Sequence, residues 1–166
     1  MKIIKGKILS YKKNPFIEEI EDSVNILYDG AILIKDGYIK EIDVFKVLKL
    51  KYPNIKVFDY GENLITAGFV DCHMHYPQTG IIASHGKRLL DWLNYYTFPE
   101  ERKFKDRQYS KKIAKLTLDL CIKNGTTTVA SFCTTSINSV EVFFEEAEKI
   151  KMCVVAGKTC MDRNAP

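Results

Sequence analysis

Several protein classes are excluded by what the sequence lacks. Its five cysteines show none of the C-x-x-C spacing of structural zinc or redox sites, and their odd number predicts reduced, mostly buried thiols. No apolar run approaches the roughly 18 to 20 residues that cross a bilayer. The start of the chain alternates polar and apolar residues, unlike a secretory signal. These absences predict a cytoplasmic protein without a membrane partner.

Concentrated positive charge is also missing. The net charge is +4, but the lysines are scattered and form only short pairs such as Lys111-Lys112. Nucleic-acid binding needs basic residues clustered on one face or along one helix. With 46% apolar and 28% charged residues, the composition is typical of a globular protein. We therefore expect a solvated, lysine-rich surface and no nucleic-acid partner.

What is present begins with a series of short strands. Alternating apolar residues predict strands at 3–9, 25–27, 31–35 and 38–42, and a helix at 44–50. Asp36-Gly37 is typical of a type I′ hairpin turn, whose two central residues both need positive φ. A small antiparallel β-sheet or β-sandwich segment over residues 1–65, without evident chemistry, is expected.

From residue 66 the pattern alternates between strand and helix. Strands are predicted at 65–75, 126–132 and 153–157, with helices at 109–124 and 139–150 between them. This order is typical of βαβ units with parallel strands, in the α/β class. A closed (β/α)8 barrel takes about 250 residues. We therefore expect residues 66–166 to be the start of such a barrel, incomplete at the C-terminus, and the chain to belong to a longer protein.

Two histidines follow the apolar part of the first barrel strand. Side chains at i and i+2 of a strand point to the same face, so His73 and His75 can reach one metal ion at about 2.0 to 2.1 Å. Tyr76-Pro77 ends the strand and places the pair at its C-terminal end, where barrel enzymes build their active sites. The spacing alone is equally compatible with two unrelated polar residues.

The surroundings of these histidines resemble the amidohydrolase superfamily. Gly68-Phe69-Val70-Asp71-x-His73-x-His75 is similar to the first barrel strand of that superfamily, a TIM-type barrel. Within it, roughly residues 65–164 resemble the guanine deaminases, on four segments: 73–78, 89–100, 124–128 and 155–162. The most specific of these is Leu-Leu-Asp-Trp-Leu-Asn-Tyr-Tyr-Thr-Phe-Pro-Glu at 89–100.

This resemblance implies a site and a reaction. His73 and His75 would bind one Zn²⁺ per active site, and His75 and Gln78 would contact guanine. The reaction would be the hydrolytic deamination of guanine to xanthine and ammonia, in purine catabolism, by a protein that is a homodimer at full length. Further ligands and the proton-shuttling glutamate and aspartate are expected beyond Pro166. No catalytic residue is therefore assignable within the chain, which alone is expected to be inactive.

Other interpretations stay open for single residues. Gln78 carries both a donor and an acceptor, as a guanine edge requires, but an ordinary solvated loop glutamine has the same sequence. Trp92 and Phe98 either line the pocket or only pack. His85 lies in a loop beyond the strand and is rejected as a ligand. Asp71 would share the face of His73 deeper in the barrel and orient a ligand or pack there.

Two other functions also remain. Another amidohydrolase, deaminating or dechlorinating a different heterocycle, would keep the zinc and change the surroundings of Trp92 and Gln78. A non-catalytic binding or assembly fragment would hold no zinc.

Overall fold

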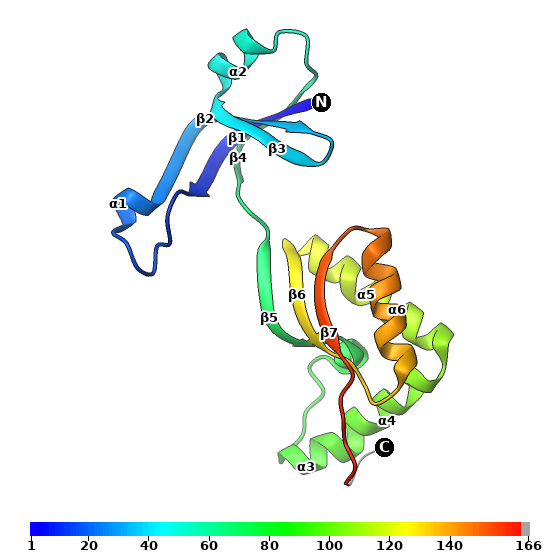
Figure 1. Ribbon diagram of the computed structural model, residues 1–166. Helices are drawn as coiled ribbons and strands as arrows, with labels where there is room; N and C mark the ends of the chain where they lie inside the picture. The colour runs from blue at the N-terminus through cyan, green and yellow to red at the C-terminus, as the bar shows by residue number, and fades with distance from the viewer. Residues whose placement is uncertain (164–166) are drawn as a thin grey trace. The chain divides into compact units, whose positions relative to one another are not determined.

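The computed structural model describes residues 1–163 and contains two compact units (Figure 1). The first comprises Met1–Ala67, and the second begins at Gly68. The last three residues of the expected 66–166 barrel segment lie outside the described residues. Each unit has its own sheet.

The first unit is built on one four-stranded sheet in the order β3-β2-β1-β4. Its elements are β1 (Lys2–Tyr11), α1 (Ile20–Ser23), β2 (Val24–Lys35), β3 (Tyr38–Val44), α2 (Phe45–Lys51) and β4 (Val57–Ile65). The predicted hairpin turn is confirmed, with φ of 53° at Asp36 and 84° at Gly37. The expectation of a purely antiparallel sheet was wrong, because β4 pairs with β1 in parallel. The two strands predicted between residues 25 and 35 are one continuous strand.

The second unit holds a parallel sheet in the order β5-β6-β7, as the alternating pattern predicted. The strands are β5 (Phe69–His75), β6 (Thr126–Phe132) and β7 (Cys153–Gly157). Between β5 and β6 run η1 (Tyr76–Ile81), α3 (Leu89–Trp92), η2 (Leu93–Thr97), α4 (Phe98–Arg102), η3 (Lys103–Lys105) and α5 (Arg107–Lys123). Between β6 and β7 lies α6 (Ile137–Lys149). Three parallel strands with intervening helices form the consecutive βαβ units that the sequence predicted.

Helices α5 and α6 cover one face of this sheet (Figure 1). Val129 and Ser131 of β6 are buried on that face, and Val154 and Ala156 of β7 are half-buried against the same core. On the other face, Val155 keeps 67% of its surface exposed. The expectation that β7 is a buried strand was therefore wrong for its alternate residues, since no described element covers that face.

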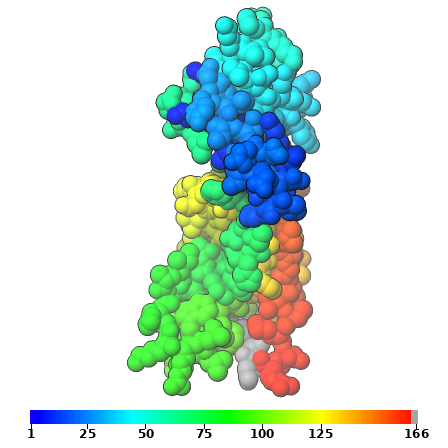
Figure 2. All heavy atoms as spheres, turned by 90° about the vertical axis from the view of Figure 1, so that its left-hand side faces the viewer, coloured from blue at the N-terminus to red at the C-terminus, as the bar shows by residue number. Residues whose placement is uncertain are grey.

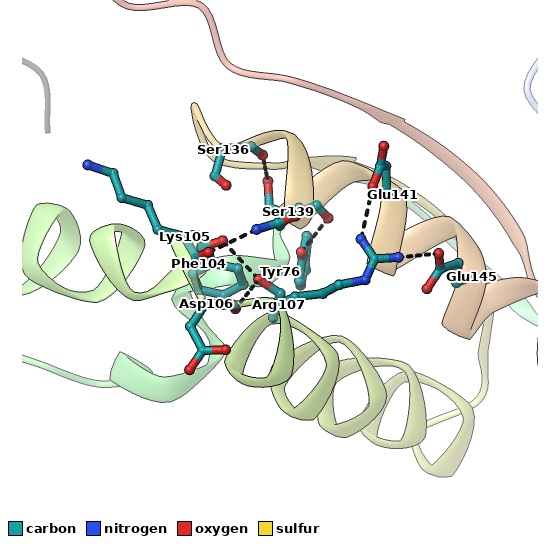
Figure 3. A network of polar contacts seen from close by, with 11 residues as sticks. Tyr76, Phe104, Lys105, Asp106, Arg107, Ser136, Ser139, Glu141 and Glu145 are labelled. Carbon is teal, nitrogen blue, oxygen red and sulfur yellow. Dashed lines mark hydrogen bonds and ion pairs between the residues drawn. The ribbon is translucent and has the colours of Figure 1, made fainter.

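The start of α5 is fastened to α6 by charged and polar contacts (Figure 3). Asp106 caps α5 by accepting hydrogen bonds from two backbone N–H groups of its first turn. Arg107 pairs with Glu141 at 2.9 Å and also with Glu145, both on α6. Asn138 donates to the carbonyl of Lys105 at 2.8 Å. These contacts fix the two helices that cover the sheet.

The cysteines differ from the expectation in burial but not in oxidation state. All five are free thiols, as predicted. Only Cys133 is buried, whereas Cys72, Cys153 and Cys160 are exposed. Among residues 1–163, no helix combines the length and the apolar character that crossing a membrane requires.

Candidate functional site

The C-terminal ends of β5, β6 and β7 meet at one end of the second unit because the strands are parallel. The segment around α3 and the residues after β7 lie at that same end in both views (Figures 1 and 2). Active sites of α/β barrels are built at this end from the loops that follow the strands. His73 and His75 are the last histidines of β5 and lie here.

The ring of Phe132, at the end of β6, contacts both histidine rings. The ring centroids of His73 and His75 are 5.3 Å apart. Phe132 stacks on His75 at 4.9 Å and meets His73 edge-on at 5.5 Å. Phe132 was not a predicted site residue. It is paired with His75 in the parallel sheet, a register that the sequence alone does not show.

A β-bulge separates His73 from Asp71. Asp71 is level with Val129 and Met74 with Ser131, so three steps along β5 match two along β6. Val129 and Ser131 face the helices, and Asp71 therefore faces them too, rather than sharing the face of His73 as predicted. Its carboxylate accepts a hydrogen bond from the backbone N–H of His73 at 3.0 Å. Asp71 thus fixes the backbone that carries His73.

Tyr76, directly after His75, anchors the end of β5 in the core. Its side chain is fully buried and stacks on Phe143 of α6, with ring centroids 4.3 Å apart. Its hydroxyl donates to the carbonyl of Ser139 (Figure 3), and its backbone N–H donates to Ser131 at 3.1 Å. Residues on either side of the histidine pair are therefore held by the helix-covered face.

A hollow of about 450 Å³ opens beside the histidines. His73, His75, Gln78 and Trp92 all line it, together with residues of the 79–84 segment. Trp92 also donates from Nε1 to the carbonyl of Ser84 at 3.1 Å, so it both lines the hollow and holds the loop. Residues far apart in sequence thus converge on one concave surface.

Two further aromatic or histidine candidates do not join this hollow. Phe98 is half-buried and is not among the described residues that line it. His85 is exposed and is also not among those lining residues.

Gln78 has a partner that the sequence did not suggest. Its Nε2 donates to Glu101 Oε1 on α4 at 3.2 Å and lies 3.4 Å from His75 Nδ1. Burial raises the pKa of the Glu101 carboxyl, and the hydrogen bond from Gln78 opposes that rise. Twenty-three residues separate the pair, and neither periodicity nor spacing links them.

The surroundings of His75 favour its neutral imidazole. Burial, and next the neighbouring His73, lower the pKa of His75. A neutral imidazole can offer a ring nitrogen to a metal ion, whereas a protonated one cannot. Both histidines come from one strand end and line one hollow, so the pair fits two positions of a zinc site. Residues 1–163 contain no cluster of three His, Cys, Asp or Glu side chains that could hold a metal.

Comparison with known proteins gives a consistent result. Residues 64–165 match the model of the amidohydrolase family. The chain is 39% identical to the guanine deaminase of Escherichia coli over its whole length, and 32% identical to a probable guanine deaminase of Deinococcus radiodurans over 98% of its length. It spans 38% of the length of each of these two relatives.

Solved structures agree with this result. The Escherichia coli guanine deaminase structure superposes with a TM-score of 0.92 at 38% identity, covering all of this chain and 39% of that one. The structure of the guanine deaminase from C. acetobutylicum, with guanine bound in its active site, gives a TM-score of 0.82 at 37% identity, covering 99% of this chain and 38% of that one. An atrazine chlorohydrolase complexed with zinc, at 16% identity, shares the fold.

Proposed function

The chain belongs to the amidohydrolase family, and from this we propose that the whole protein hydrolyses guanine to xanthine and ammonia. One observation carries the proposal: His73, His75, Gln78 and Trp92 line one hollow at the strand ends of a chain with guanine deaminase relatives. The expected separation into a segment of residues 1–65 and a barrel segment from residue 66 is part of the same proposal.

One zinc ion is the proposed cofactor, held in part by His73 and His75. Two imidazoles fill half of a tetrahedral shell, so the remaining positions need ligands other than these two. Bound zinc would lower the pKa of a water molecule to near 7 and so supply a nucleophile at neutral pH. The chain's own contribution is to hold both imidazoles: Asp71 fixes the backbone at His73, and Phe132 packs on the ring of His75.

Gln78 is the proposed contact to the purine. It lines the same hollow as the histidines and carries both a hydrogen-bond donor and an acceptor, as does the edge of guanine. Trp92 forms part of the wall and limits the space for water. His75, between the metal position and Gln78, would also touch the substrate. Protons on the leaving ammonia need an acid and a base from outside these residues.

The wider setting is proposed on the same resemblance. A guanine deaminase would serve purine catabolism in the cytoplasm, and the relatives' family suggests a homodimer. These proposals need no nucleic-acid or membrane partner.

The test is guanine turnover by the full-length protein, followed as xanthine formation. Treatment with a chelator should abolish turnover, and added zinc should restore it. Turnover unaffected by thorough removal of metal would contradict the zinc proposal. A zinc-loaded protein that leaves guanine unchanged would contradict the substrate and favour another heterocycle, and a protein without zinc or hydrolysis would favour a binding role.

A further inference from the structure

We propose that Glu101 is a positioning residue, which holds the amide of Gln78 so that its carbonyl oxygen is the group left for the substrate. The inference rests on the proposed function, because Gln78 is its proposed purine contact. Glu101 itself is not among the residues that line the hollow, and it acts through its hydrogen bond to Gln78.

The orientation of the amide follows from its partners. Oε1 of Glu101 accepts from Nε2 of Gln78, so the amide turns its NH₂ group towards Glu101. One N–H donates to Glu101 Oε1 at 3.2 Å, and the same nitrogen lies 3.4 Å from His75 Nδ1. The carbonyl oxygen of Gln78 remains as an acceptor. Such an amide selects a ring that presents an N–H donor.

Glu100, the neighbour of Glu101, holds helix α4 in place for this role. It is 4% exposed and accepts hydrogen bonds from Tyr109 and, at 2.6 Å, from Lys103. A Cβ added to Gly80 would come within 2.7 Å of Glu100 Oε1, so α4 and the segment of Gln78 lie in direct contact. Gln78 and Glu101 are therefore carried by two segments that pack against one another, and their hydrogen bond does not depend on a free loop.

This arrangement has a consequence for specificity. A site that accepts a hydrogen bond from the substrate rejects an analogue that lacks the donor, because its own acceptor is then left unpaired. Without Glu101, the amide can rotate and offer its NH₂ group instead. Loss of Glu101 should therefore weaken the binding of guanine and relax discrimination against purines methylated at a ring N–H.

The experiment is a double-mutant cycle on the full-length, zinc-loaded protein. The variants are Gln78→Ala, Glu101→Ala and the double variant, with Glu101→Gln as the conservative replacement and Arg102→Ala as a matched control on the same helix. KM and kcat for guanine are measured for each, with KM for 1-, 7- and 9-methylguanine and a thermal melt as a check on folding.

Glu101→Ala should raise KM roughly three- to tenfold, the effect of one lost hydrogen bond, with a smaller change in kcat. The double variant should match Gln78→Ala alone, because both changes remove the same contact. Glu101→Gln keeps a hydrogen-bond partner but can donate as well as accept, so it should recover only part of the loss. Arg102→Ala should behave as wild type.

Other results would overturn the inference in distinguishable ways. If the effects of Gln78→Ala and Glu101→Ala multiply in the double variant, Glu101 does not act through Gln78, while the proposed function stands. An equal loss in Arg102→Ala would assign the effect to helix α4 as a whole. No guanine turnover by the wild-type protein would overturn the proposed function and this inference together.

Discussion

The two faces of the sheet β5-β6-β7 have different roles, although the same strands form both. The face under α5 and α6 holds the buried core, with Val129 and Val142 fully covered. The other face carries the exposed side chains of His73, His75 and Phe132. Because neighbouring residues of a strand point to opposite faces, β5 and β6 each contribute to the core and to the site. Changes on one face should therefore leave the other largely intact.

The largest effect expected is loss of turnover in His73→Ala. Loss of residues that merely support a ligand costs about 10- to 100-fold in metal affinity or activity, so loss of the ligand itself should exceed this. Because His73 is exposed, stability without zinc should change by no more than about 0.5 kcal/mol. Zinc content, turnover and denaturant unfolding of the metal-free protein measure this separation.

His85→Ala is the matched control. His85 is exposed in its loop and stands apart from the hollow that His73 lines. It should keep both zinc and turnover. Equal losses of zinc and turnover in the two variants would contradict the proposed site on the face that carries His73 and His75.

The covered face is tested by Phe143→Ala. Phe143 is fully buried on α6 and stacks on Tyr76, so truncation should destabilise the fold by about 3 to 5 kcal/mol. Phe144, the next residue, is 41% exposed, and Phe144→Ala should cost less than half as much. Denaturant unfolding of the two variants at neutral pH gives the comparison. Similar losses in unfolding free energy would contradict the assignment of Phe143 to the buried side of α6 and Phe144 to its exposed side.

The smallest effect expected is a pH dependence that comes from Cys133. Burial raises its thiol pKa from an ordinary 9.0 to about 12, against the opposing effect of a backbone hydrogen bond from Gly157. A group with a raised pKa in the folded state contributes stability below its unfolded pKa and loses it as pH rises towards the folded value. Stability should therefore fall by about 1 to 2 kcal/mol between pH 9 and 10.5.

Cys133→Ala should flatten that pH dependence, as followed by unfolding midpoints at pH 8 and 10.5. Alkylation gives a second measure, since the exposed Cys72 and Cys153 should react in the folded protein and Cys133 only on unfolding. Rapid alkylation of folded Cys133 would contradict its burial.

Elements defined by local pattern were predictable from the sequence. The bounds of β6 and β7 match the prediction, and α5 ends before Gly125, whose φ is 83°. Apolar periodicity and glycine punctuation are properties of neighbouring residues, so a single sequence shows them. The i,i+2 spacing drew attention to His73 and His75, whereas Gln78 was proposed only from the family resemblance. The structure brings all three to one hollow.

What the sequence did not reveal depends on pairing between distant segments. The bulge in β5 exists only in relation to β6, and the parallel pairing of β4 depends on which edge of β1 is free. Glu101 meets Gln78 because α4 packs on the turn after β5, a contact set by Glu100 and Gly80. Counting alternation along β5 alone assigned Asp71 to the wrong face, because the count could not include the bulge.

The bulge in β5 shifts the two-residue alternation of its side chains by one position. Asp71 and Met74 stand an odd number of residues apart yet point to the same side, so the extra residue is absorbed between them. Removing one residue between Asp71 and Met74 would restore regular alternation. Either Asp71 or the histidines would then point to the opposite face of the sheet. In an alignment of such chains, a one-residue gap at this point would thus mark a strand whose side chains on one side of the gap face the opposite side of the sheet. The motif residues themselves would all still be present.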